Sequence, residues 1–239
     1  NPMVAAFKAV FVEISNTQSS LVQLAFYGGY ATMAIPAALF IRKYSYKSGI
    51  LLGLALYSLG ALLFLPAAYT ENFFWFPFSL YILTFGLAFL ETTANPYILS
   101  MGDPSTATRR LNLAQAFNPM GSLLGMLVAS KLVLRNLQAK DFFADITAKL
   151  SAQGVPENGM AEAIKTYLAE PANQAAYAAM KTHDITVIRD PYVILGLVVA
   201  VFFFIFLFCK LRDQRAAEQI HPIETAKRLF RNRNWVGGV

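Results

Sequence analysis

Charged residues are scarce in this sequence. Only 14% of the residues are Asp, Glu, Lys or Arg, and 56% are hydrophobic. A soluble globular protein averages roughly 25% charged residues. So few charges cannot cover a globular surface that faces water on every side, which excludes an ordinary soluble protein. The composition predicts a chain whose surface is largely covered by lipid.

Cysteine and histidine are also nearly absent. Cys209 is the only cysteine, so no intrachain disulfide can form, and His183 and His221 lie too far apart for a zinc site. An integral-membrane enzyme would need paired acids or histidine-rich loops at the membrane interface, and the sequence has neither. We therefore expect no metal, no cofactor and no enzymatic activity.

Two features of the first residues bear on the extent of the chain. It opens on Asn1 rather than methionine. Its first apolar stretch has neither the basic leader nor the small-residue cleavage site of a signal peptide. We expect the sequence to be a fragment of a longer protein.

Long apolar runs recur along the chain. Crossing a bilayer takes about 20 apolar residues in a helix, and in lipid a helix satisfies its own backbone hydrogen bonds. An apolar stretch at the start looks like the end of an earlier crossing. We expect an all-α membrane protein with a truncated first helix at 1–12 and further crossings at 21–41, 49–68, 73–101, 111–135 and 190–209.

Lysine and arginine gather in every second loop. The loops after the second, fourth and sixth crossings carry Arg42, Lys43, Lys47, Arg109, Arg110, Lys210, Arg212, Arg215, Lys227, Arg228, Arg231 and Arg233, whereas the stretch 136–190 holds five basic against seven acidic residues. Basic loops stay in the cytoplasm, so both ends of a complete half would be cytoplasmic. This placement also explains the net charge of +6 better than nucleic-acid binding does.

Two segments lie outside the expected crossings. Residues 136–189 form an extracytoplasmic insertion, in which Met160, Ile164, Tyr167 and Leu168 recur at helical spacing. We expect one or two amphipathic helices on or above the outer membrane face, as a solvated loop insertion rather than a lid. Residues 210–239 read as a cytoplasmic linker, with an amphipathic helix at Pro222 to Arg233.

Glu91 is the most informative residue. It is the only charged residue in the apolar run 73–101. Placing a carboxylate in the membrane costs free energy, so such a residue usually marks an ion or substrate path. Asn95 shares its helix face, and Pro96 frees a backbone carbonyl near Thr92. The alternative is a structural pairing of Glu91 with a polar group on another helix. No basic residue lies within the apolar runs 21–41, 49–68, 111–130 and 192–209 of the other complete crossings, which favours function.

Further polar residues line two neighbouring crossings. Gln115 and Asn118 on the fifth crossing offer amides that match sugar hydroxyls, although amides also hold membrane helices together. Gln23, Tyr27 and Tyr30 form a polar, aromatic stripe on the second crossing that could stack on a sugar ring, although tyrosines also anchor helices at the interface. Gly49 with Gly53 and Gly121 with Gly125 predict close approach of helices.

Four strings carry a resemblance to a known family: QLAFY at 23–27, YKSG at 46–49, LETTANP at 90–96 and RLNLAQAFN at 110–118. They resemble the bacterial L-fucose:proton symporters of the major facilitator superfamily, to which glucose/galactose and N-acetylglucosamine permeases are related. The resemblance implies that this chain is the six-helix amino-terminal half of a twelve-helix transporter. It also implies that Glu91 is the protonatable glutamate of the central cavity and that Gln115 and Asn118 face that cavity.

The chain departs from the family at two places. An ungapped alignment back from Gln23 puts Pro2 where the family's first helix has a second carboxylate, an aspartate. Either that carboxylate is missing or the start of the chain is out of register. The outer connection 136–189 is longer than the corresponding one in the fucose permease.

The function that the resemblance implies is sugar:proton symport by alternating access across the bacterial inner membrane. L-fucose is the expected sugar, with glucose, galactose or N-acetylglucosamine as alternatives, and passive sugar facilitation as a rival mechanism. Glu91 would carry the proton, and Glu91, Asn95, Gln115, Asn118, Tyr27, Tyr30 and Gln23 would contact the sugar. The expected partners are a monosaccharide, membrane lipid and the carboxyl-terminal half, with no nucleic acid.

Overall fold

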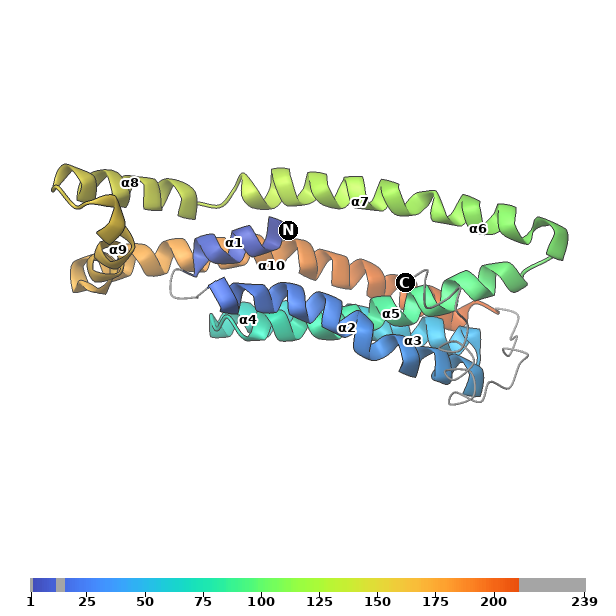
Figure 1. Cartoon of the computed structure of the whole chain (residues 1–239). Coiled ribbons are helices and arrows are strands. Elements are labelled where there is room, and N and C mark those ends of the chain that lie inside the picture. Colours follow the sequence, from blue (N-terminus) through green and yellow to red (C-terminus); the bar gives the residue numbers. More distant parts are fainter. Residues whose placement is uncertain (1, 12–15, 211–239) are drawn as a thin grey trace, which may run out of the picture.

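The computed structural model describes residues 2–11 and 16–210, and the regular elements of these residues are helices (Figure 1). The expected linker helix at Pro222 to Arg233 lies outside the described residues. In chain order the helices are α1 Pro2–Val10, α2 Asn16–Lys43, α3 Tyr46–Leu62, α4 Phe64–Thr70, α5 Trp75–Ser100, η1 Pro104–Thr106, α6 Ala107–Gln115, α7 Phe117–Val128, η2 Ala129–Leu134, α8 Ala139–Ala152, η3 Glu157–Gly159, α9 Met160–Ala169 and α10 Pro171–Phe208.

Five helical stretches within the described residues are long and apolar enough to span a membrane: Thr17–Lys43, Tyr46–Thr70, Trp75–Ser100, Pro104–Leu134 and Pro171–Phe208. The expected all-α membrane fold is thereby confirmed. The stretch Tyr46–Thr70 comprises α3 and α4, and Pro104–Leu134 comprises η1, α6, α7 and η2. The α5 helix continues through Pro96 to Ser100.

The last crossing differs from its expected bounds. Its helix α10 is 38 residues long and begins at Pro171, not near residue 190. Pro171 stands in the first turn, where a backbone N–H has no partner within the helix, so the missing N–H of proline costs no hydrogen bond. An alanine-rich polar segment then continues the helix. At about 1.5 Å per residue α10 is about 57 Å long, far longer than the apolar part of a bilayer. The apolar pattern of the sequence therefore predicted only the second half of this helix.

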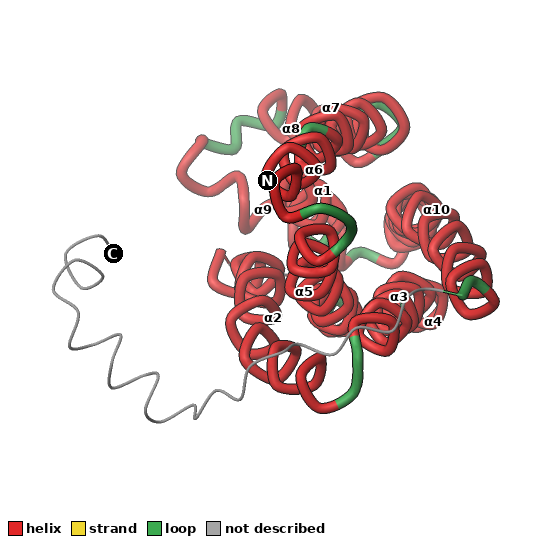
Figure 2. The backbone as a smooth tube through the Cα atoms, turned by 90° about the vertical axis from the view of Figure 1, so that its right-hand side faces the viewer, coloured by secondary structure: helices red, strands yellow, loops and turns green. Residues whose placement is uncertain are grey.

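The α5 helix lies in the middle of the bundle, between α2 and α3, while α10 packs against α3 (Figure 2). The close approach of helices expected at Gly49 and Gly53 is confirmed. A Cβ on Gly49 would lie 2.7 Å from the Thr93 Oγ1, and a Cβ on Gly53 would lie 2.9 Å from the Leu90 Cγ. The prediction was wrong for Gly121 and Gly125, where a Cβ would meet nothing within 4 Å. The face of α7 that carries these two glycines is open in this chain.

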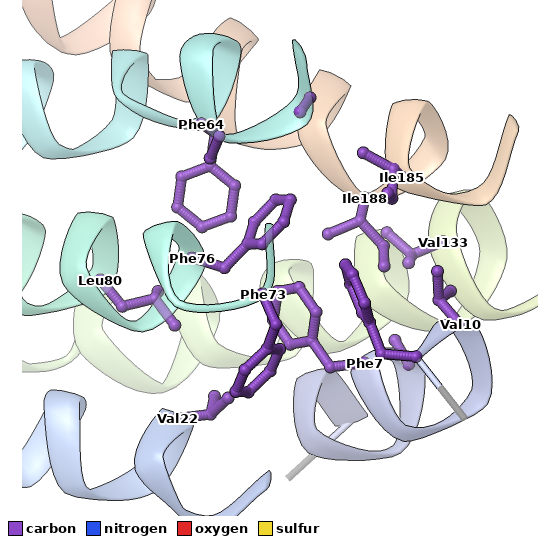
Figure 3. Packing of buried hydrophobic residues seen from close by; sticks show 14 of the residues in the cluster. Phe7, Val10, Val22, Phe64, Phe73, Phe76, Leu80, Val133, Ile185 and Ile188 are labelled. Atoms are coloured by element: carbon purple, nitrogen blue, oxygen red, sulfur yellow. The ribbon is translucent and has the colours of Figure 1, made fainter. Parts of the chain in front are cut away.

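A core of apolar side chains closes one end of the bundle. Phe7 and Val10 of α1 meet Phe64 of α4, Phe76 of α5 and Ile188 of α10 there (Figure 3). The Phe64 ring also stacks on Tyr192 of α10, with ring centroids 4.0 Å apart. Because α10 enters this core before its most apolar part begins, the helix is fixed to α1, α4 and α5 at the same level.

The segment 136–189 contains the amphipathic helices that we expected, which are α8 and α9. Its helices α8 and α9 and the first half of α10 extend past one end of the bundle (Figure 1). They share a small core around Ile146, Leu150 and Leu168, and the helically spaced apolar residues of α9 pack into it. The amphipathic pattern therefore faces a neighbouring helix, because an apolar stripe is buried by whichever surface lies closest.

Asp184 of α10 joins this outer unit to the bundle. Its fully buried carboxylate accepts hydrogen bonds from the backbone N–H groups of Gln138 and Ala139, at 2.9 and 2.8 Å, and lies 3.0 Å from the His183 Nδ1. Gln138 supplies no side-chain cap for α8, so Asp184 caps α8 from another helix. The Thr182 hydroxyl also donates to the Glu71 carboxylate at 2.6 Å.

Basic side chains of the expected cytoplasmic loops cap helix ends at the opposite end. The Lys47 ammonium donates to the carbonyls of Leu207 and Cys209, at 3.2 and 2.8 Å, where α10 ends. The Arg110 guanidinium donates to the carbonyl oxygens of Ile98 and Leu99 in the last turn of α5, at 3.4 and 3.3 Å, and to that of Asp103 at 2.9 Å. Hydrogen bonds from Ser105, and more weakly the charge of Arg110, lower the pKa of Asp103. These basic residues therefore stabilise helix termini, in addition to contributing the positive charge from which the membrane orientation was predicted.

Candidate functional site

Glu91 lies on α5, the central helix of the bundle, with its side chain exposed. The ion pairs among residues 2–11 and 16–210 are Lys165 with Glu162, His183 with Asp184, and Arg189 with Asp190. Glu91 belongs to none of them. The carboxyl group is therefore not paired with a fixed cation in the described part of the chain.

Tyr30 of α2 approaches the same carboxyl group. Its half-buried side chain lies close enough to Glu91 for the two groups to interact. The two helices come close at the preceding residue, because a Cβ on Gly29 would lie 2.8 Å from the Thr84 Cβ. A second polar link joins the same helices, where the Thr32 and Tyr81 hydroxyls are 3.1 Å apart. Close packing of α2 on α5 thus brings a phenol to the acid.

Asn95 and Gln115 form an amide bridge one helical turn beyond Glu91. The Gln115 Nε2 donates to the Asn95 Oδ1 at 2.8 Å. Asn95 is half-buried on α5, and Gln115 is exposed at the end of α6. The two amides come from helices that are consecutive in the chain, and their remaining donors and acceptors are available to a ligand.

The structure brings together Glu91, Tyr30, Asn95 and Gln115, but not every residue that the sequence suggested. Gln23 and Tyr27 are exposed on α2, and the Tyr27 ring packs edge-on against Phe26 with centroids 5.5 Å apart. Asn118 is exposed near the start of α7. In the described residues no contact joins these three side chains to Glu91, so their roles stay predictions.

Sequence reasoning missed two features of the site. Tyr57 of α3 lies near Tyr30 of α2, and no spacing rule connects residues on different helices. The other is the break after Gln115, where α6 ends and α7 begins at Phe117. Pro119 has no N–H to donate to the Gln115 carbonyl four residues earlier. That signal was present in the sequence.

Comparisons with known proteins agree with this architecture. The Major Facilitator Superfamily profile matches residues 1–138. The chain is 57% identical over 205 residues to the L-fucose-proton symporter of Haemophilus influenzae, covering 86% of this chain and 43% of that protein. It is 37% identical over 132 residues to the glucose/galactose transporter of Brucella abortus, covering 55% and 32%.

A solved structure gives the same picture. The crystal structure of a variant of the fucose:proton symporter of Escherichia coli superimposes with a TM-score of 0.71 at 30% identity, covering 98% of this chain and 52% of that one. The chain spans about half the length of the proteins that it matches.

Proposed function

The chain belongs to the major facilitator superfamily, and from this membership we propose that it forms the amino-terminal half of a bacterial sugar:proton symporter with Glu91 as its proton carrier. The observation that carries the proposal is the polar cluster on α5. An exposed carboxyl group, with no ionic partner among residues 2–11 and 16–210, lies near Tyr30 and one turn from the Asn95–Gln115 amide bridge. In a membrane-spanning helix such a group is a functional site by default.

The chemistry of the cluster suits a sugar and a proton. Amide groups donate and accept hydrogen bonds at once, as sugar hydroxyls do, and Gln115 and Asn95 keep unused donors and acceptors after bridging. The Glu91 carboxyl changes its charge when it binds a proton, whereas the amides do not. The cluster therefore holds one group that can respond to a proton gradient beside an exposed amide, that of Gln115, that can recognise hydroxyls.

The proposed mechanism is alternating access. Glu91 takes a proton from the outer side, and its neutral form lowers the cost of closing the cavity around the sugar, because burying a charged carboxylate is costly. The cavity then opens to the cytoplasm, where Glu91 releases its proton and the sugar leaves. The empty carrier returns to the outward-facing state. The matching half of the transporter would supply the opposite wall.

L-fucose is the proposed sugar, in the bacterial inner membrane, with both ends of the half in the cytoplasm. The name of the Haemophilus influenzae relative supports L-fucose, and the name of the Brucella abortus relative keeps glucose and galactose as alternatives. A panel of these sugars and N-acetylglucosamine, tested by proton-coupled uptake, decides among them. Passive facilitation is separated by the external pH, which rises on sugar entry only if protons enter too.

The substitution Glu91→Gln tests the role of the carboxyl group in a full-length protein that carries this sequence. Glutamine keeps the size and the hydrogen-bonding capacity of the side chain but cannot titrate. We expect uphill sugar uptake driven by a pH gradient to fall to background, while exchange of labelled for unlabelled sugar is retained. Unchanged uphill uptake would remove Glu91 from the mechanism.

The matched control is Glu71→Gln. It makes the same chemical change at a carboxylate that lies between α4 and α5 and hydrogen-bonds Thr182. Because Glu71 is remote from the cluster on α5, uphill uptake by this variant should stay close to that of the unsubstituted protein. A comparable loss in both variants would point to a general effect of removing an acid.

A further inference from the structure

The amide bridge joins a packed helix to an open one. Asn95 is half-buried on α5, which lies between α2 and α3. Gln115 is the last residue of α6, and no side chain of α6 is buried. Of the two amides, Asn95 therefore has the fixed position, and Gln115 is the one that depends on its partner for an orientation.

Gln115 would be mobile without this partner. Fixing a long glutamine side chain costs up to about 2 kcal/mol of conformational entropy. Its backbone is also weakly held, because α6 ends at Gln115 and Pro119 cannot donate to its carbonyl. The 2.8 Å bond from the Gln115 Nε2 to the Asn95 Oδ1 fixes the side chain before any sugar arrives.

The bridge leaves most of the hydrogen-bonding groups of the Gln115 amide free. It occupies one of the two amide protons, so the Oε1 and the second N–H remain for the hydroxyls of a sugar. A group that is ordered in advance binds more tightly, because the ligand does not meet the cost of ordering it. The bridge therefore favours sugar binding without Asn95 touching the sugar.

We propose that Asn95 is a positioning residue, which orients the Gln115 amide toward the sugar and makes no sugar contact of its own. The inference rests on the sugar transport proposed above and refines the role of one residue in it. Since Asn95 is one turn from Glu91 on α5, it sets the position of the sugar-binding amide relative to the proton carrier.

The test measures exchange of labelled for unlabelled L-fucose by the full-length protein, because exchange requires no net movement of protons. Asn95→Leu should raise the half-saturating sugar concentration about tenfold, the factor expected for one lost hydrogen bond. The maximal exchange rate should change less. Asn95→Asp keeps an acceptor for the Gln115 Nε2, so it should stay within about threefold of the original value.

A double substitution distinguishes positioning from direct contact. Asn95→Leu combined with Gln115→Leu should bind sugar no more weakly than Gln115→Leu alone, because both changes break the same bond. Additive losses would give Asn95 a sugar contact of its own and overturn the proposal. So would an Asn95→Asp variant as weak as Asn95→Leu, or an Asn95→Leu variant that stays within about twofold of the original value.

Asn112→Leu is the matched control, since it makes the same change at an exposed amide one turn before Gln115 on α6. It should alter the half-saturating concentration by less than about twofold. All variants are compared as monodisperse protein after size-exclusion chromatography. If Asn95→Leu does not fold, Asn95→Ser replaces it, because serine is too short to reach the Gln115 Nε2.

The outcomes separate this inference from the function on which it rests. An unsubstituted protein that exchanges neither L-fucose, glucose, galactose nor N-acetylglucosamine would overturn both. A protein that exchanges L-fucose normally and tolerates Asn95→Leu would overturn the positioning role alone.

Discussion

Gly86 shows how one missing side chain sets the distance between two helices. A Cβ on this residue of α5 would overlap the backbone nitrogen of Tyr57 in α3 and lie 2.6 Å from the carbonyl oxygen of Gly53. The neighbouring atoms are backbone, so they cannot move aside as the end of a flexible side chain could. The contact between α3 and α5, and with it the placement of Glu91, depends on this glycine.

We therefore predict that Gly86→Ala destabilises the chain. Overpacking a rigid contact typically costs about 1–3 kcal/mol, so the melting temperature of the 239-residue chain in detergent should fall by about 2–12 °C. Thermal unfolding followed by circular dichroism measures the change. A melting temperature within about 1 °C of the original would contradict the packing described here.

Gly121→Ala provides the comparison within the same chain. A Cβ at this position of α7 meets nothing within 4 Å, and alanine favours helix by about 1 kcal/mol relative to glycine. The same substitution should therefore be neutral or slightly stabilising in the 239-residue chain. In the structure the two glycines differ in what lies opposite them.

At the scale of elements, α10 does more than cross the membrane. Its first half packs with α1, α4 and α5, and through Asp184 it caps α8. The helix thereby links the outer unit, formed by α8, α9 and the start of α10, to the bundle that contains Glu91. A buried carboxylate that accepts several hydrogen bonds is a strong link, because hydrogen bonds to a charged group are stronger than neutral ones.

Asp184→Asn should loosen α8 without unfolding the bundle. Asparagine is uncharged and has one acceptor oxygen instead of two, so it cannot replace both hydrogen bonds to the carboxylate. A loss of about 2 kcal/mol in the stability of α8 should speed hydrogen exchange of the α8 amides about thirtyfold. Mass spectrometry of the exchanged protein measures this. Exchange within α5 should not change, and equal acceleration in α5 would mean that Asp184 supports the whole bundle instead.

Asp141→Asn is the control for charge alone. Asp141 is exposed in the first turn of α8, where an acid contributes through the helix dipole. Its loss should speed exchange of the α8 amides by no more than about fivefold. A similar effect of both substitutions would show that charge near the helix start matters more than the buried hydrogen bonds.

The whole molecule has two different ends. One carries the outer unit with its mixed charges, and the other carries the loops in which Lys47 and Arg110 hold helix termini. The excess of lysine and arginine at the second end is the basis for proposing that this end faces the cytoplasm. Cys209, the only cysteine, is exposed at that end.

The orientation can be measured with the native cysteine. A membrane-impermeant maleimide should label Cys209 in inside-out vesicles but not in intact cells. In a Cys209→Ser background, Gln153→Cys in the turn that follows α8 should show the opposite pattern. Labelling of Cys209 from the outside would reverse the topology that the basic residues indicate.

The sequence by itself determined the class of fold and the residue of most interest. Long uncharged runs identify membrane helices because lipid admits few charges, and Glu91 stands out because a carboxylate in such a run needs a reason to be there. The same argument identified Asn95, which lies on the Glu91 face of one helix. These features depend on neighbours along the chain, so they can be read from spacing alone.

Only the tertiary structure decided which polar residues meet. Spacing could not reveal that Gln115 bonds Asn95, that Tyr30 rather than Gln23 reaches Glu91, or that Asp184 caps α8. It also missed the length of α10, because a polar helix outside the lipid gives no hydropathy signal. Contacts between helices depend on their crossing points, which are set by packing at positions such as Gly29 and Gly86, and those distances are not encoded in any one segment of the chain.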